Sequence, residues 1–151
     1  MTEQRSEPIS DLYSRRILQL AGAIGRIGRL ESPDASADAV SRLCGSRITV
    51  DLKLEDGRIS DYAQEVEACA LGQTAASVMA REIVGSTPAE LRDLRERMWN
   101  MLKHDGPPPE GKWADLALLE GVREYPARHG SVMLPFDAVV KALDRTGAAS
   151  T

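Results

Sequence analysis

The sequence contains few cysteines, histidines and aromatic residues, and it has no long hydrophobic run. Two cysteines among 151 residues are too few for a disulfide framework, and neither the two cysteines nor the two histidines have the short spacing of a Cys2His2 zinc finger. No apolar stretch approaches the roughly 20 residues that span a bilayer, and the first residues, MTEQRSEPISDL, lack the apolar segment of a signal peptide. We therefore expect a cytoplasmic protein without membrane attachment, whose cysteines are free thiols or metal ligands.

An excess of positive charge is also missing. The 19 Lys and Arg residues are outnumbered by 23 Asp and Glu residues, which gives a formal net charge of -4. Without a basic block, the chain has no electrostatic footprint for nucleic acid. The sequence contains no P-loop, dinucleotide-binding glycine fingerprint, GxSxG elbow or HExxH motif. These absences exclude a nucleic-acid partner and leave no motif of a stand-alone enzyme.

The overall composition is that of a folded globular protein. Hydrophobic residues make up 42% of the chain and charged residues 28%, and a chain of this length buries about two-thirds of its surface on folding. We predict a single domain over residues 1–151. Its ends, at 1–9 and 146–151, are expected to be flexible, and a proline-rich loop is expected at 105–112 because consecutive prolines cannot continue a helix.

Alternating hydrophobic residues predict an antiparallel hairpin in the first half of the chain. Apolar residues at every second position from Ile48 to Leu54 indicate a strand over Arg47–Glu55. Asp56-Gly57 is typical of a tight turn, and Arg58–Glu67 returns as a second strand with a bulge near Asp61. Before the hairpin, Gly25 to about Asp38 is predicted to be irregular, and a short strand is expected around Val40 and Leu43.

Apolar residues spaced three or four apart predict helices elsewhere. Thr87 and Glu90 have the form of a capping box with Pro88 at the first helical position. The expected helices cover Ser10–Ile24, Leu71–Ile83, Pro88 to near His104, Trp113–Val122 and Met133–Leu143. This order predicts an α+β fold in which a small antiparallel sheet of about three strands packs against several helices.

The two cysteines are the residues most able to carry chemistry. Cys69 lies where a strand gives way to a helix, so the helix dipole and unpaired amides would lower the pKa of its thiol. Its thiolate could be a nucleophile or a metal ligand, and the alternative is a small buried side chain. Cys44 precedes Gly45 in a loop before the hairpin. That loop could fold back and bring the two sulfurs together.

Two thiolates do not complete the four-coordinate shell that zinc or a cluster iron prefers. Further ligands must come from elsewhere, and the chain has only two histidines. His104 lies beside the proline-rich loop and is interpreted as a solvated helix end. His129, in the segment Pro-Ala-Arg-His-Gly-Ser, is the histidine that could join a metal site.

Five segments of the chain have a familiar order and spacing: Asp11-Leu12-Tyr13, Gly28-Arg29-Leu30-Glu31, Leu43-Cys44-Gly45-Ser46, Asp56-Gly57-Arg58-Ile59 and the run from Ala68 to Met79. Together they resemble the U-type iron–sulfur cluster assembly scaffold family, which includes IscU, SufU and the N-terminal domain of NifU. The resemblance covers nearly the whole chain and is specific in the order and spacing of its segments. The 118–128 segment and the loop at 105–112 are most similar to the SufU branch, and the LPPVK motif of the IscU branch is absent.

The resemblance implies a SufE/NifU-like fold and a role without enzymatic turnover of its own. Members of the family hold a nascent [2Fe-2S] cluster, iron or zinc with three cysteines and an aspartate. They receive sulfur from a cysteine desulfurase and supply recipient apo-proteins. Cys44 and Cys69 match two of the family's cysteines, whereas Ser46 stands at the position of the aspartate and Ser131 at that of the third cysteine.

These two replacements matter because a hydroxyl is a much poorer ligand than a thiolate for soft metals. His129 could complete a site; two subunits could pool Cys44 and Cys69 in a homodimer; or metal binding could be lost in a partner-binding relative. The function predicted first is an iron–sulfur scaffold or carrier that binds iron or a [2Fe-2S] cluster through the two cysteines. The alternative is a zinc-dependent sulfur acceptor for a desulfurase.

Overall fold

The computed structural model describes residues 14–147, so the predicted end at 1–9, the start of the first predicted helix and residues 148–151 lie outside the described residues. Three strands and five helical segments are present in this part of the chain. In order they are α2 (Arg15–Gly22), β1 (Ala35–Ser41), β2 (Ser46–Glu55), β3 (Arg58–Glu67), α3 (Ala70–Glu82), α4 (Pro88–Lys103), the 3-10 helix η1 (Gly111–Glu124) and α5 (Pro126–Thr146). The predicted α+β fold with a small sheet and several helices is confirmed.

The sheet is antiparallel, with its strands in the order β1-β2-β3. The predicted hairpin is confirmed, because β2 and β3 pair on either side of the Asp56-Gly57 turn. The expected bulge is also present: Lys53 pairs with Asp61 but Leu54 pairs with Ile59, which leaves Ser60 as the extra residue. At the other end of β2, Ser46 pairs with Ser41 across a short turn.

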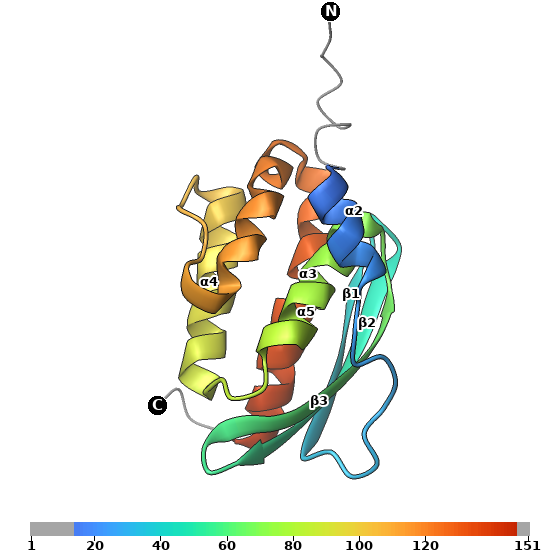
Figure 1. Ribbon diagram of the computed structural model, residues 1–151, viewed down its shortest axis with the longest axis vertical. Helices are drawn as coiled ribbons and strands as arrows, with labels where there is room; N and C mark the ends of the chain where they lie inside the picture. The colour runs from blue at the N-terminus through green and yellow to red at the C-terminus, as the bar shows by residue number, and fades with distance from the viewer. Residues whose placement is uncertain (1–13, 148–151) are drawn as a thin grey trace, which may run out of the picture.

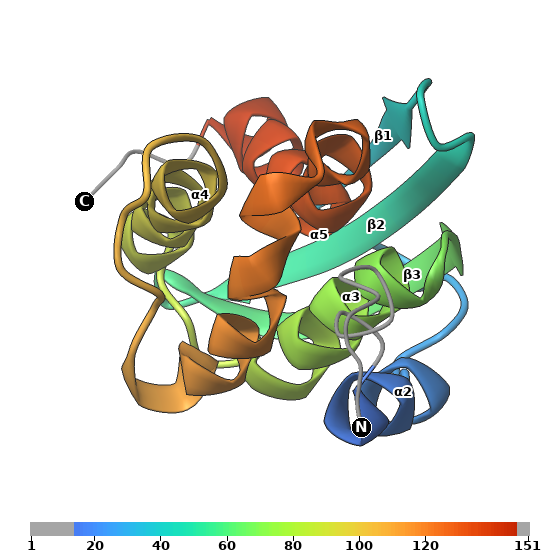
Figure 2. The ribbon, with the colours of Figure 1, turned by 90° about the horizontal axis from the view of Figure 1, so that it is seen from above.

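The helices cover one face of the sheet (Figures 1 and 2). Helix α5 packs on β1 and β2, while α3 packs on β3 and beside α5. Helix α2 lies against α3. Helix α4 packs on α5, and η1 contacts α3, α4 and α5, so neither makes a major contact with the sheet. The core lies between the sheet and this layer of helices. No helix among residues 14–147 is both long and apolar enough to cross a bilayer.

Helices α2 and α4 begin at side chains that cap them. The Ser14 hydroxyl accepts a hydrogen bond from the Ile17 amide, and the Thr87 hydroxyl accepts one from the Glu90 amide. The Thr87 hydrogen bond of the predicted capping box is therefore present at the start of α4. Helix α4 ends at Lys103 with His104 as its C-cap, as predicted. The predicted proline-rich loop is irregular from Asp105 to Glu110, and its last two residues begin η1.

The predicted helix at Trp113–Val122 is present, but it is a 3-10 helix extending over Gly111–Glu124. Its buried residues, Trp113, Leu116, Leu119 and Val122, are spaced by three. A helix with three residues per turn places such residues on a single line. This spacing was readable in the sequence and favours a 3-10 helix over an α-helix.

Two predicted boundaries are wrong. The first strand begins at Ala35 within the stretch expected to be irregular, because Ala35 and Ala37 face the core with side chains too small to give a clear alternating pattern. Helix α5 begins at Pro126 and not near Met133, and it extends to Thr146, with Gly147 as its C-cap. Gly130 and Pro135 have low helix propensity, so the sequence pattern does not indicate a helix over the first turns of α5. Burial of one face of α5 outweighs this low propensity.

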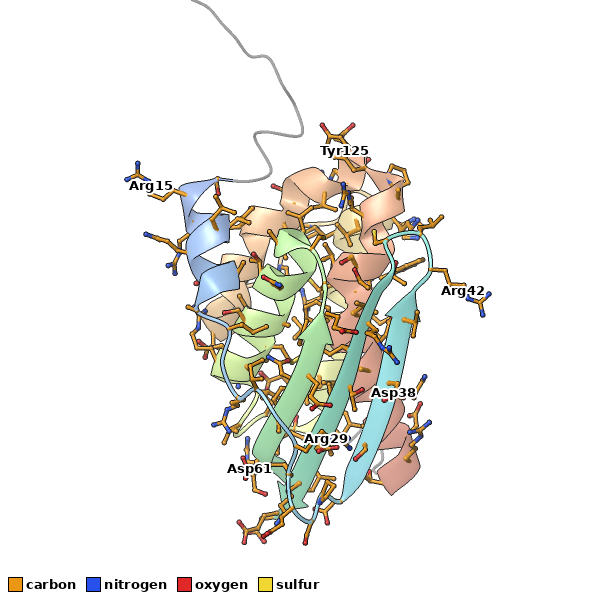
Figure 3. All side chains as sticks on the ribbon, turned by 90° about the vertical axis from the view of Figure 1, so that its right-hand side faces the viewer. Arg15, Arg29, Asp38, Arg42, Asp61 and Tyr125 are labelled. Atoms are coloured by element: carbon orange, nitrogen blue, oxygen red, sulfur yellow. The ribbon has the colours of Figure 1, made fainter. Side chains whose placement is uncertain are left out.

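The connection between α2 and β1 crosses the open face of the sheet (Figure 3). It is held there by Asp51, which is fully buried. The Asp51 carboxylate accepts two hydrogen bonds from the Arg29 guanidinium, at 2.7 and 2.9 Å, and one from the Leu30 amide at 2.9 Å. The Ser36 hydroxyl also donates to it. Burial opposes ionisation of Asp51, but these donors hold its pKa below the usual range.

Candidate functional site

The two cysteines lie at the same end of the sheet. Cys44 is in the turn of residues 42–45 that joins β1 to β2, where Gly45 has a φ of 66°. Cys69 follows β3 and is the N-cap of α3. Because Arg47 pairs with Glu67, continuing the antiparallel register places residue 45 opposite residue 69. The expectation that the loop carrying Cys44 lies near the end of β3 agrees with this register.

The start of α5 completes this end of the molecule. Figure 3 shows Tyr125, immediately before α5, at the same end as Arg42 in the β1–β2 turn. The Cys44 thiol donates a hydrogen bond to the Ala127 carbonyl oxygen at 2.9 Å. The Cys69 sulfur lies 3.5 Å from the Ser131 hydroxyl oxygen. Ala127 and Ser131 are four residues apart, about one helical turn, so both sulfurs contact the first turns of α5.

The two serines at the ligand positions implied by the family resemblance are buried and contact each other. Ser46 is 2% exposed and Ser131 is fully buried. The Ser131 hydroxyl donates to the Ser46 hydroxyl oxygen at 3.2 Å. Ser46, Ser131 and Cys69 therefore form one connected polar group. The serines of this group are buried, whereas Cys69, like Cys44, is partly exposed.

Helices α3 and α5 meet very closely at this group. A Cβ atom on Gly72 would lie 2.5 Å from the Ser131 hydroxyl oxygen and 3.1 Å from the Ser131 carbonyl oxygen. A side chain at position 72 would therefore force the two helices apart. Gly72 is thus a site residue that sequence reasoning missed, and its place in the first turn after Cys69 was the available indication.

The environment of Cys69 favours its thiolate. Burial acts to raise the pKa of the thiol, but the Ser131 hydroxyl, the amides of Gly72 and Leu71, and the charge of Arg128 together bring it below its usual value. The hydrogen of the Ser131 hydroxyl can rotate from Ser46 toward the sulfur when Cys69 ionises.

Arg128 was missed as a functional residue by sequence reasoning. It belongs to a segment that carried the family resemblance, but nothing in its spacing marked it as a neighbour of Cys69. The structure reveals it because α5 begins earlier than predicted and brings residues 127–131 beside the two cysteines.

His129 is buried, with 4% of its surface exposed. Its Nε2 lies 2.9 Å from the Val122 carbonyl oxygen, which can only accept, so Nε2 carries the proton. Its Nδ1 is buried and has no hydrogen-bond partner, and burial lowers the pKa of the ring. Among residues 14–147, no three His, Cys, Asp or Glu side chains gather closely enough to hold a metal ion. His129 and the two cysteines therefore do not form a three-ligand set.

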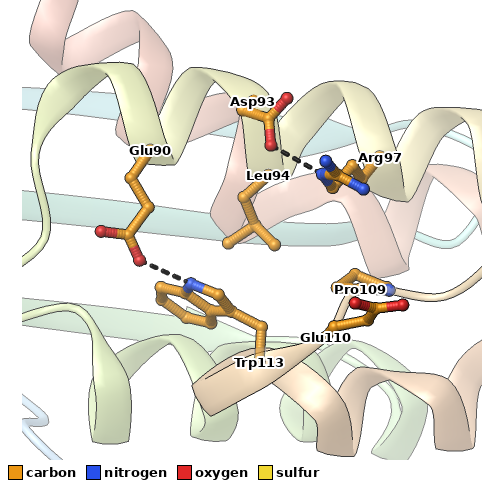
Figure 4. Close-up of a pocket in the computed structure, with 7 residues that line it drawn as sticks. All are labelled: Glu90, Asp93, Leu94, Arg97, Pro109, Glu110 and Trp113. Carbon is orange, nitrogen blue, oxygen red and sulfur yellow. Dashed lines mark hydrogen bonds and ion pairs between the residues drawn. The ribbon is translucent and has the colours of Figure 1, made fainter.

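A pocket of about 210 Å³ lies between α4 and the start of η1 (Figure 4). Four of its polar side chains are already paired: the Trp113 indole donates to Glu90 at 2.9 Å, and Arg97 donates to Asp93 at 2.6 Å. Lys112 also lies 3.4 Å from Glu90. The pocket presents no nucleophile or metal-ligand set, and we assign it no ligand.

Comparison with known proteins places this arrangement in a family. The model described as "NifU-like N terminal domain" matches residues 12–132. The chain is 30% identical to the iron–sulfur cluster assembly scaffold protein IscU of Thermotoga maritima over 89% of this chain and 94% of that protein. It is 26% identical to the zinc-dependent sulfurtransferase SufU of Bacillus subtilis over 66% of this chain and 68% of that protein.

A solved structure gives the same result. The crystal structure of a nitrogen-fixing NifU-like protein, N-terminal part, from Brucella abortus is 51% identical to this chain and superposes with a TM-score of 0.91. The superposition covers 93% of this chain and 98% of that one. The resemblance inferred from the sequence is confirmed, and the chain belongs to the NifU-like N-terminal domain family.

Proposed function

We propose that this protein is an iron–sulfur cluster assembly scaffold or carrier whose chemistry passes through the thiolates of Cys44 and Cys69. The observation that carries the proposal is the placement of both sulfurs against the first turns of α5, at Ala127 and Ser131. Family membership and relatives named IscU and SufU support this role. In it the protein holds and passes on cargo and does not turn over a substrate as an enzyme.

A single chain cannot supply four good protein ligands for an iron–sulfur cluster or a metal ion. The chain contributes two thiolates, while Ser46 and Ser131 are buried hydroxyls that bond to each other. Hydroxyls are poor ligands for iron, zinc and other metals that prefer sulfur. Two chains together offer four thiolates, the number that a [2Fe-2S] cluster requires. A homodimer that shares the cluster is therefore the form of the carrier that the residues support best.

A zinc-dependent sulfur acceptor is the second candidate. The pKa of Cys69 lies below that of an ordinary thiol, which suits attack on a persulfide, and one relative is named a zinc-dependent sulfurtransferase. Zinc has the same difficulty as iron, since two thiolates leave its tetrahedral shell incomplete. In either role the sulfur donor would be a cysteine desulfurase and the recipients apo-proteins, in the cytoplasm.

Anaerobic reconstitution tests the proposal. The reduced protein is supplied with iron and inorganic sulfide, and bound iron, zinc and sulfide are quantified per chain together with the native mass. We expect iron and sulfide in the parent at dimer mass and their loss in Cys69→Ser. Ser60→Ala, which changes an exposed serine of β3 far from the thiols, serves as the matched control. Zinc alone would favour the sulfur acceptor, and no metal in any variant would overturn both roles.

A further inference from the structure

One chain has too few thiolates to fill the coordination shell of a metal ion, but its two thiols are enough to form a disulfide. Sulfur in a persulfide is at oxidation level zero, and its release as sulfide requires two electrons. Two thiols that join in a disulfide supply two electrons. We propose that Cys69 accepts a sulfur atom from a persulfide and that Cys44 then releases it as sulfide by forming a Cys44–Cys69 disulfide. This inference rests on the proposed function, because it states how the site would obtain sulfide.

The first step assigns the attack to Cys69. Its thiolate attacks the outer sulfur of a donor persulfide, R–S–SH; the bond between the two donor sulfurs breaks, the donor leaves as R–S⁻, and Cys69 becomes Cys69–S–SH. Cys69 is the thiol at the N-terminus of a helix, as the N-cap of α3, and its sulfur lies 3.5 Å from the Ser131 hydroxyl oxygen. Such surroundings stabilise the attacking thiolate.

The second step assigns the release to Cys44. The Cys44 sulfur attacks the inner sulfur of Cys69–S–SH, the bond between the persulfide sulfurs breaks, and the outer sulfur leaves as hydrogen sulfide. The Cys44 proton balances the step: Cys44–SH and Cys69–S–SH give Cys44–S–S–Cys69 and H₂S. The persulfide sulfur is reduced by two electrons, and the two cysteines are oxidised by the same number.

Cys44 and Cys69 both contact the start of α5. Its thiol contacts Ala127 one helical turn from Ser131, which contacts the Cys69 sulfur. Cys44 lies in a short turn beside Gly45, whose positive φ gives the turn a conformation that other residues rarely adopt. The sequence has no third cysteine to compete for the persulfide. A dithiol reductant, such as a protein with a Cys-x-x-Cys pair, would reduce the disulfide before the next cycle.

The test uses the full chain, reduced and freed of other thiols, with glutathione persulfide as the sulfur donor. Released sulfide is measured with time, and intact mass is recorded without reductant. In the parent we expect one sulfide per chain and the loss of two hydrogens as the disulfide forms. Cys44→Ser should instead retain one added sulfur on Cys69 and release sulfide at least tenfold more slowly. Cys69→Ser should neither gain sulfur nor release sulfide above the rate of the donor alone.

Two controls make the result specific. Leu43→Ala changes the exposed neighbour of Cys44 in the same turn, where Leu43 is 81% exposed, and should release sulfide like the parent. Cys44→Ala should behave as Cys44→Ser does, which excludes an effect of the new hydroxyl. Equal release by the parent and both Cys44 variants would overturn the proposal, as would a stable persulfide on the parent. Reconstitution with inorganic sulfide bypasses both steps, so it tests the proposed function separately.

Discussion

At the scale of single residues, the candidate site is defined by hydroxyls where the family resemblance implies ionisable ligands. Ser46 and Ser131 are buried, and the Ser131 hydroxyl donates to that of Ser46 at 3.2 Å. Because they satisfy each other, these hydroxyls cost little free energy when buried without a metal. The pair can therefore stay buried without a metal ion, while the Cys69 sulfur beside it is partly exposed.

Introducing a cysteine at position 131 should create a zinc-binding site. Ser131→Cys would place a third thiol beside Cys69, so we expect this variant to retain about one zinc ion per chain through gel filtration, with two or more thiolates bound to the ion. Zinc content after loading and chelator-free washing is the measurement. Ser60→Cys, which adds a thiol on the exposed side of β3, should retain no more than the parent. Equal zinc in both variants would show that position 131 lies outside the ligand set.

The Ser131 hydroxyl should also set the reactivity of Cys69. It is among the groups that lower the pKa of the thiol, so Ser131→Ala should raise that pKa. A higher pKa leaves less thiolate at neutral pH, so iodoacetamide should react more slowly there, and the rate-against-pH curve should move to higher pH. The comparison is made in a Cys44→Ser background to isolate Cys69, with Ser60→Ala as the control. Superimposable pH curves would contradict this role.

At the scale of elements, the site depends on how closely α3 approaches α5. Gly72 permits that approach, since a Cβ there would lie 2.5 Å from the Ser131 hydroxyl oxygen. Gly130 does the same between α5 and β1, where a Cβ would lie 2.6 Å from the Ser41 hydroxyl oxygen. The glycines thus place the Ser131 end of α5 against both the sheet and the start of α3.

Gly72→Ala should therefore destabilise the protein although alanine favours helices. Overpacking of a tight interface typically costs about 1–3 kcal/mol, and we expect a loss of about 1–2 kcal/mol in the free energy of unfolding after the gain in helix propensity. Urea denaturation measures this loss. Gly22→Ala in α2 is the matched control, because a Cβ there meets nothing within 4 Å. A Gly72→Ala variant as stable as Gly22→Ala would contradict the packing argument.

The elements also show what could be predicted from the sequence. Ile48 to Leu54 alternate clearly enough to predict β2, and Thr87 with Glu90 predicts the start of α4. The start of α5 could not be predicted because Gly130 and Pro135 are local helix breakers whose cost is offset by contacts with distant residues. The same long-range packing places Arg128 and Ser131 beside Cys69, so the cysteines were identified but the surroundings that activate Cys69 were only partly foreseen.

At the scale of the whole molecule, four thiolates are available only when two chains meet. The two sulfurs lie at one end of the sheet, where the turn before β2 and the start of α5 are exposed together (Figure 3). A cluster bound there would be shared by the ends of two molecules. Assembly state and cargo should therefore be linked by mass action.

Removal of the bound iron–sulfur cluster should return the dimer to monomers. We expect the reconstituted protein to have the mass of a dimer and to return to a monomer when a strong iron chelator removes the cluster. Native mass spectrometry before and after chelation measures both states, and Cys69→Ser should remain monomeric throughout. A loaded monomer would show that the missing ligands are not supplied by a second chain.

The contacts of the site join parts of the chain that are far apart in sequence. Cys44 and Ala127 are separated by 83 positions, and Cys69 and Ser131 by 62. The three strands, in contrast, pair with their immediate neighbours across short turns. Local pairings close small loops and form early in folding, whereas distant contacts must wait for large loops to close. On a ribosome, Cys69 would emerge as an ordinary thiol, and its lowered pKa would arise only after the chain beyond Ser131 has been synthesised.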